Sequence, residues 1–245
     1  MQHVLKYLEI PGNKCYGLEQ LQRFGSDYRD IIVPVVCPLL ATEAKRVRHV
    51  AAETLAKVAG RGHQEVITSV CALLEHRDAF VREQVASLLS IVAEQGDPFA
   101  IERIRACMWH ENSSIRHSAF KVFILHAAKQ DVIQLSHQII EDDLEKENRI
   151  EALNSLRAFA GAGDQCAIAT IARALEFDVD VRRHAVHLFR ALAAGPEFEF
   201  RFAVNEVSKR LVHECPSVRR SALWAYSCVA KKDEVFIAVK ACIES

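Results

Sequence analysis

Histidine and cysteine pairs at helical spacing are the side chains of this chain best suited to binding a metal. His184 and His187 lie three residues apart, as do Cys107 and His110, so each pair would project from one face of a helix. A structural zinc site needs four nitrogen or sulfur ligands. Neither pair has third and fourth ligands at a suitable spacing. The pattern therefore favours surface histidines, and we predict no metal and no cofactor.

Other catalytic patterns are also missing from the sequence. The stretch GAGDQC at 161–166 has no preceding strand, so it indicates a turn between helices rather than a dinucleotide-binding loop. No nucleophile stands beside a candidate base in a recognisable motif. We therefore predict that the protein is not an enzyme.

The composition is that of a folded and electrically balanced chain. Half of the 245 residues are hydrophobic and 26% are charged, which allows a sizeable core. The 9 glycines and 6 prolines are few for a β fold and typical of long helices. A formal net charge of −1 gives no electrostatic footprint for nucleic acid, so we predict no nucleic-acid partner.

Cysteine usage and hydropathy point to an intracellular protein. The eight cysteines are spread along the chain without a C-x-x-C pair, mostly within apolar helical patterns, which favours a reducing compartment over a disulfide framework. The first residues, MQHVLKYLEIPGNK, lack the apolar region of a signal peptide. No apolar run approaches the ~20 residues that span a bilayer. We expect a soluble, cytoplasmic protein without membrane insertion.

An arginine recurs with nearly constant spacing through most of the chain. The anchoring arginines are Arg48, Arg82, Arg116, Arg149, Arg182 and Arg219, separated by 34, 34, 33, 33 and 37 residues. Apolar residues recur one before, three after and seven after each of them, with Asn148 as an exception before Arg149. These positions share one face of an α-helix, so each unit is expected to bury that face. Because the arginines occur in every unit, we predict that their role is structural.

A second helical pattern precedes each arginine helix, which makes the unit a helical pair. Aspartates that suit a helix N-terminus stand at the start of these first helices, at Asp97, Asp131, Asp164 and Asp233. Glycines that suit the end of the preceding helix are Gly60, Gly62, Gly96, Gly161, Gly163 and Gly195. A lone pair leaves its apolar face exposed, so neighbouring pairs should stack into a solenoid.

This repeat, with its D-x-x-V-R period, resembles the HEAT repeat family, and most closely the short HEAT-like repeats of the phycobilin-lyase type. The resemblance covers about residues 27–245. It implies an all-α fold, a right-handed α-solenoid (α-α superhelix) of about six to seven helix pairs. We expect residues 1–26 to form a capping helical segment, residues 27–245 the repeat array, and residues 233–245 a terminal half-repeat.

The family's aspartate four residues before the arginine typically bonds the arginine of an adjacent repeat. Asp78 and Asp178 match it and Asn112 and Glu145 approximate it. Ala44 and Cys215 depart from it. A continuous row of such aspartate–arginine bonds from repeat to repeat is therefore expected to be interrupted in this chain.

Enzymes with this fold are the alternative functions. A di-iron hydroxylase needs His-Glu pairs on the arginine helices, but VRHVAAETL at 47–55 has Val50 where glutamate is required. The pairs His110-Glu111 and His213-Glu214 fall at the ends of the first helices instead. A phycobilin lyase matches in repeat type, but no chromophore motif is recognisable. A DNA glycosylase needs a basic concave surface, which the balanced charge disfavours.

The resemblance and the absence of catalytic motifs lead to a non-enzymatic function, a protein-interaction scaffold or a structural subunit of a larger assembly. The partner is expected to bind along the concave face of the arginine helices. The predicted partner-binding residues are Arg183, His184, His187, Arg190, Arg220 and Trp224, with His117 and Lys121 earlier in the array. Arginine and tryptophan are enriched in binding hot spots. We predict that the last two full repeats bind an acidic or carboxylate-bearing segment of another protein.

Overall fold

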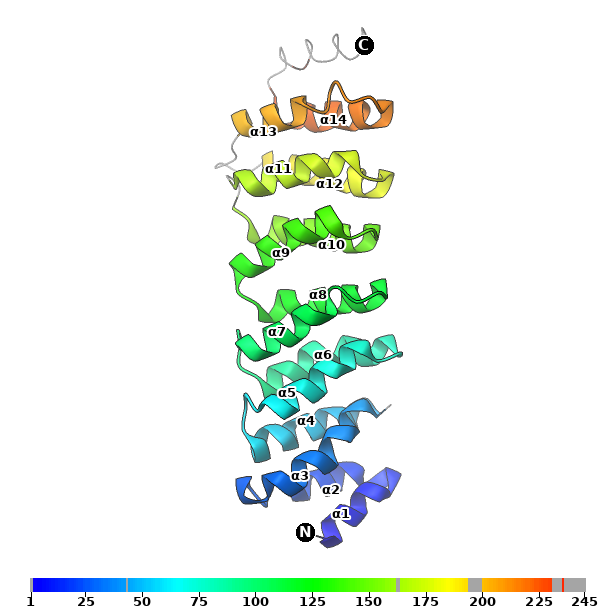
Figure 1. Ribbon diagram of the computed structural model, residues 1–245, viewed down its shortest axis with the longest axis vertical. Coiled ribbons are helices and arrows are strands. Elements are labelled where there is room, and N and C mark those ends of the chain that lie inside the picture. Colours follow the sequence, from blue (N-terminus) through cyan, green and yellow to red (C-terminus); the bar gives the residue numbers. More distant parts are fainter. Residues whose placement is uncertain (1, 43, 162–163, 194–199, 231–234, 236–245) are drawn as a thin grey trace. The chain divides into compact units, whose positions relative to one another are not determined.

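A computed structural model of the chain describes residues 2–42, 44–161, 164–193, 200–230 and 235. Two compact units divide the chain, Met1–Ala128 and Lys129–Ser245. Every regular element among the described residues is a helix, 14 of them α-helices, which confirms the all-α prediction. The helices follow one another as pairs in sequence order within each unit (Figure 1).

The first unit contains four helical pairs. Its α-helices are α1 (Gln2–Glu9), α2 (Lys14–Leu21), α3 (Arg29–Val36), α4 (Lys45–Ala59), α5 (Gln64–Cys71), α6 (Ala79–Val92), α7 (Pro98–Cys107) and α8 (Ser113–His126). Short 3-10 helices extend α3 at Cys37–Ala41 and α5 at Ala72–Glu75. The second helices of successive pairs pack together, α2 on α4, α4 on α6 and α6 on α8. First helix α5 packs on first helix α7 in the same way.

The second unit repeats this arrangement over three pairs. Its helices are α9 (Lys129–Asp142), α10 (Lys146–Phe159), α11 (Gln165–Arg173), α12 (Val179–Ala193), α13 (Phe200–Ser208) and α14 (Pro216–Val229). Here α10 packs on α12 and α12 on α14, while α11 packs on both α9 and α13. Each helix therefore contacts its own pair and the neighbouring pairs, as a solenoid requires.

The core consists of the helix face that the arginine spacing predicted. The residue three after each arginine is fully buried in all six units, as Ala51, Val85, Ala119, Ala152, Ala185 and Ala222. The residue seven after it is at most 8% exposed in every unit. The buried Asn148 replaces the usual apolar residue before Arg149, and its side-chain amide donates to Asp143 Oδ2 at 2.9 Å. The predicted helical face is confirmed, with this one polar substitution satisfied inside the fold.

The helix ends follow the capping chemistry predicted from the sequence. Asp97 and Asp164 cap α7 and α11, each accepting a backbone N–H bond at 3.0 Å. Asp131 lies in the first turn of α9, and Asp233 lies outside the described residues. Gly60, with a φ of +82°, ends α4 as predicted. Gly62 and Gly96, with φ of +83° and +79°, differ from the prediction, because their N–H groups bond the carbonyls at the ends of α6 and α8 in the following pairs and not those of the preceding helix. Gly163 and Gly195 also lie outside the described residues.

At the N-terminal end, the buried Leu18 and Leu21 of α2 face the first unit's core, and Thr54 of α4 donates to Leu18 O at 3.3 Å. The division into a capping segment at 1–26 and an array at 27–245 remains a prediction. The predicted half-repeat at 233–245 lies outside the described residues except for Val235.

Candidate functional site

The recurring arginines bind backbone carbonyls in the turn that joins the two helices of their own pair. Arg82 donates to His76 O at 2.8 Å and Arg77 O at 3.2 Å. Arg116 and Arg219 repeat both contacts in their own turns, at 2.8 to 3.0 Å. Arg48 and Arg182 each donate to one turn carbonyl at 2.6 Å. The guanidinium thus satisfies carbonyls that the end of the first helix leaves without partners.

The family aspartate has a local function in this chain. Asp78 Oδ1 accepts the N–H of Phe80 at 2.9 Å, and Asp178 Oδ1 accepts the N–H of Asp180 at 3.0 Å. Both carboxylates therefore cap the second helix of their own pair. Ala44 and Glu145, at the equivalent position, make no side-chain capping bond.

A histidine six residues before the arginine completes the turn, and sequence reasoning missed it. In His76, His110 and His213 the ring Nδ1 accepts the backbone N–H of the residue two positions on, at 3.0 to 3.1 Å. The carbonyl of the same histidine is the acceptor for the arginine. Aligning the repeats on the arginine would have exposed this recurrence. The residues weighed as metal-binding His-Glu pairs are thus turn histidines.

Arg149 departs from this pattern because its guanidinium stacks on an aromatic ring. Its Cζ lies 3.9 Å from the centroid of the Phe177 ring, which comes from the next pair in the same unit. A cation over a ring face is attracted to the ring's electrons, at about 0.5–2 kcal/mol. The arginine at this repeat therefore links two neighbouring pairs.

Replacing Arg116 with alanine is expected to lower the free energy of unfolding by about 1–3 kcal/mol, since the His110 and Glu111 carbonyls lose their guanidinium donor. The exposed Arg103 on α7 is the matched control, and its replacement should change stability by less than about 0.5 kcal/mol. Urea unfolding followed by circular dichroism measures both. Equal stability of the two variants would contradict the structural role.

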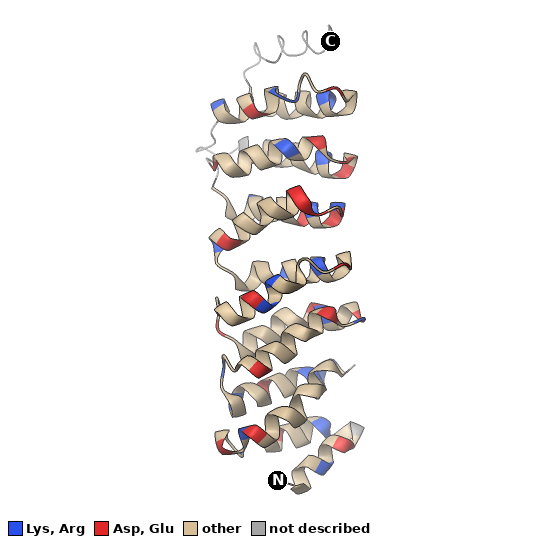
Figure 2. Cartoon of the chain, in the orientation of Figure 1, with Lys and Arg blue, Asp and Glu red and all other residues tan. Residues whose placement is uncertain are grey.

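A groove between α12 and α14 gathers four of the predicted partner-binding residues. The groove has a volume of about 290 Å³, and Arg183, His187, Arg220 and Trp224 line it. Arg182, Val179, Val186, Ser217 and Ser221 complete its walls. Trp224 is 67% exposed although it lies on a helix whose opposite face is buried. Lys and Arg positions are visible on both helices in Figure 2.

The first unit has grooves at equivalent positions with different chemistry. Between α6 and α8, a groove of about 200 Å³ is lined by His117 and Lys121, the two earlier predicted residues. Glu83 there stands at the position of Arg183, and Lys121 at that of Trp224. Between α4 and α6, a more open groove of about 590 Å³ is lined by Lys45, Arg46 and His49. The position of the grooves repeats, whereas their charge varies.

The remaining two predicted residues lie outside the α12–α14 groove. His184 Nε2 lies 2.8 Å from Asn154 Oδ1 on α10. Burial lowers the pKa of His184, with smaller contributions from His187 and Arg157. Arg190 is exposed on α12 and is not part of the groove lining. Their role in binding a partner remains a prediction.

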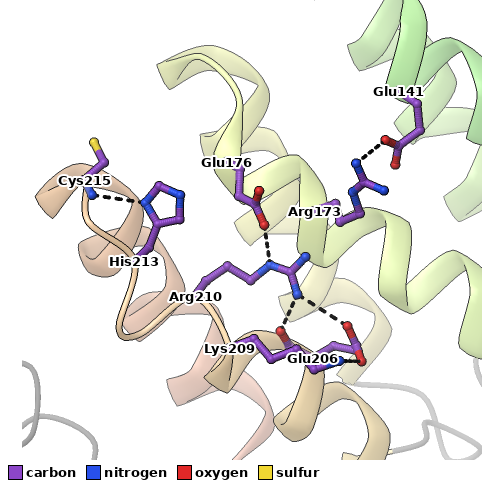
Figure 3. Close-up of polar contacts among 8 residues, drawn as sticks. All are labelled: Glu141, Arg173, Glu176, Glu206, Lys209, Arg210, His213 and Cys215. Carbon is purple, nitrogen blue, oxygen red and sulfur yellow. Dashed lines mark hydrogen bonds and ion pairs between the residues drawn. The ribbon is translucent and has the colours of Figure 1, made fainter.

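A buried charge cluster lies near the end of α13, where Arg210 reaches between two glutamates (Figure 3). Arg210 Nε donates to Glu176 Oε1 at 2.8 Å, and Nη1 donates to Glu206 O at 2.7 Å. Glu206 Oε2 lies 3.4 Å from the same Nη1, and Lys209 forms a further ion pair with Glu206. Arg173 and Glu141 form the corresponding, more exposed pair one repeat earlier, at 2.6 Å. Each pair joins the ends of successive first helices.

Cys215, which immediately precedes α14, has a lowered pKa. Its Sγ lies 3.1 Å from Ser217 Oγ at the start of α14. The hydrogen bond from Ser217 lowers the pKa of Cys215, and the backbone N–H groups of Val218 and Ser217 and the charge of Arg182 lower it further. Burial instead raises the pKa of Cys71 to about 12 and of Cys107 to about 11.

Two further features of the described part of the chain bear on other functions. No group of three or more His, Cys, Asp or Glu side chains there is arranged to hold a metal ion. Nor is any helix within it both long and apolar enough to pass through a membrane.

Comparisons with known proteins give the repeat type. One solved structure that matches is a designed armadillo repeat protein, 16% identical, with a TM-score of 0.29; the match covers 93% of this chain and 99% of that one. No curated protein matches the sequence. Residues 30–123 match the family model of HEAT repeats. The predicted resemblance to HEAT repeats is thereby confirmed for residues 30–123.

Proposed function

We propose that the protein is a non-enzymatic scaffold that binds another protein along the exposed face of its second helices. The observation that carries this proposal is the groove between α12 and α14, where an exposed tryptophan lies beside Arg183 and Arg220. Arginine and tryptophan supply large contact areas and directed hydrogen bonds, and they dominate binding hot spots. A carboxylate-bearing segment is the partner that this groove suits best.

The electrostatics of the groove support an acidic partner. None of its lining residues is an aspartate or glutamate, while three are arginines. Among the described residues, neither Arg183 nor Arg220 has a carboxylate oxygen within 4.0 Å. The nearby Asp180 has a lowered pKa mainly because of Lys146, and Arg183 makes a smaller contribution. The two guanidinium groups can therefore donate to a partner without first breaking an ion pair.

Charge reversal tests this function. When partners are recovered from cells and quantified, the double variant Arg183→Glu, Arg220→Glu is expected to recover at least about tenfold less of the main partner than the wild type does. The control is Arg103→Glu, Arg201→Glu, which makes the same change in net charge at exposed positions on α7 and α13. Wild-type affinity for the recovered partner should also fall with added salt. Equal recovery by the two folded variants would reject the proposal.

A further inference from the structure

The α12–α14 groove contains a buried hydrogen-bond donor that is not satisfied. Arg182 is 9% exposed, and one of its terminal nitrogens donates to Phe177 O at 2.6 Å. Its Nε has no acceptor among the described residues. A buried donor without a partner destabilises the fold, and a charged one does so more strongly. The Arg182 guanidinium is thus a positive charge at the groove that the described acceptors do not fully satisfy.

The equivalent groove of the first unit shows how the fold can satisfy this donor. There Arg82 Nε donates to Ser118 Oγ at 3.3 Å. Ser221 is the counterpart of Ser118 in the α12–α14 groove, and it lines that groove without accepting from Arg182 Nε. Arg149 Nε also lacks an acceptor, but its guanidinium is covered by the Phe177 ring. Arg182 Nε has almost no accessible surface of its own, so at the groove the buried Arg182 supplies positive charge rather than an open donor.

The charge in the groove exceeds what one carboxylate neutralises. Arg182, Arg183 and Arg220 carry three positive charges, and the Ser221 hydroxyl adds a neutral donor. A carboxylate brings one negative charge and two acceptor oxygens. A phosphorylated serine or threonine brings about −1.5 to −2 charges and three acceptor oxygens. Guanidinium groups match phosphate oxygens with paired hydrogen bonds.

The groove can also hold the neighbouring residue of a peptide. Its volume of about 290 Å³ is at the lower end for ligand sites, which suits one modified side chain with an adjacent residue. Val179 and Trp224 provide exposed apolar surface at the same groove. We infer that the α12–α14 groove receives a phosphorylated serine or threonine, flanked by an apolar residue, in the partner segment. This inference rests on the proposed function of the same groove.

Tryptophan fluorescence offers a direct test, because the chain has only two tryptophans. In a Trp109→Phe background, Trp224 is the remaining reporter at the groove. The probes are three end-blocked tripeptides, leucine–phosphoserine–leucine and its aspartate and serine counterparts, together with inorganic phosphate. The phosphoserine peptide is expected to change the Trp224 emission and to bind about tenfold or more tightly than the aspartate peptide. The serine peptide and inorganic phosphate should bind more weakly than either.

Two double variants in the same background complete the test. Arg183→Ala, Arg220→Ala should lose the preference for phosphoserine, whereas Arg103→Ala, Arg201→Ala should keep it. Equal affinities for the phosphoserine and aspartate peptides would overturn the inference and leave the acidic-segment proposal intact. Inorganic phosphate binding as tightly as the phosphoserine peptide would overturn it as well, because the site would then recognise the free anion and not the peptide. The proposed function would fail on a separate result. In that case the folded Arg183→Glu, Arg220→Glu variant would recover as much partner as its control variant.

Discussion

Replacing Arg210 with alanine is expected to lower the free energy of unfolding by about 3 kcal/mol. The reason is that Arg210 is only 8% exposed and serves both Glu176 and Glu206. Its loss leaves Glu206, which is 9% exposed, with Lys209 as its remaining ion-pair partner. It also leaves the Glu206 carbonyl without the Nη1 donor. Urea unfolding monitored by circular dichroism measures the change.

The chain supplies a matched control for this prediction. Arg173 stands nine residues before Arg182, as Arg210 stands nine before Arg219, and it pairs with Glu141. Its side chain is 56% exposed, against 9% for that of Arg210. Solvent screens an exposed pair, so Arg173→Ala should cost less than about 1 kcal/mol. Similar costs for the two substitutions would show that burial does not set the strength of this contact.

The double substitution Arg210→Met, Glu206→Leu separates the two parts of the effect. Removing Arg210 alone leaves the buried Glu206 charge behind, whereas replacing both residues leaves only Glu176, whose side chain is 38% exposed. The double variant is therefore expected to be more stable than Arg210→Ala. If the double variant is less stable than Arg210→Ala, the ion pair itself makes a net stabilising contribution to the fold.

The helical pairs could be predicted from the sequence because burial there is periodic. The residues three and seven after each arginine are buried in every unit, so one spacing rule accounts for the core of the six second helices that carry the arginine. The same rule places Arg183, Arg220 and Trp224 on the opposite, exposed face, where the structure has them at one groove. Periodicity specifies which face of a helix a residue occupies, and for these residues the face was sufficient.

Contacts that depend on one particular residue could not be read in this way. The position nine before the arginine is leucine, cysteine, isoleucine or arginine in different units, so Arg210 gave no repeated signal. The turn histidines are an exception, because they recur at three of the six units and an alignment on the arginine reveals them. The free Nε of Arg182 depends on side-chain placement in the groove, because the sequence offers Ser221 as an acceptor just as it offers Ser118 to Arg82. Sequence spacing does not specify such geometry.

Cys215 is expected to react with iodoacetamide at lower pH, and faster at neutral pH, than Cys71 or Cys107. The thiolate is the reacting form. With a pKa of about 12, Cys71 has about one thiolate in 10⁴ molecules or fewer near pH 7.5. Cys215 has a pKa below that of a free thiol, so its rate should exceed that of Cys71 by about 10²-fold or more. Mass spectrometry of the alkylated peptides at a series of pH values measures each rate.

The pKa shift of Cys215 also gives stability a defined pH dependence. Its pKa in the folded chain is below that in the unfolded chain, so ionisation of Cys215 favours folding. This contribution is fully present above the unfolded pKa and is lost as the pH falls through the folded pKa. Cys215→Ser should remove it, and the stability difference between wild type and variant should therefore grow with rising pH across that window.

Ser217→Ala identifies the source of the shift, because the Ser217 hydroxyl is its largest cause. The alkylation profile of Cys215 should move to higher pH in this variant, while those of Cys71 and Cys107 stay in place. Ser114 on α8, at the equivalent position after Asn112, is the matched control, and Ser114→Ala should leave the Cys215 profile unchanged. A Cys215 profile that is the same in both variants would assign the lowered pKa to the N–H groups at the start of α14. The thiolate would then be held as Asp78 is held at the start of α6, by the helix end alone.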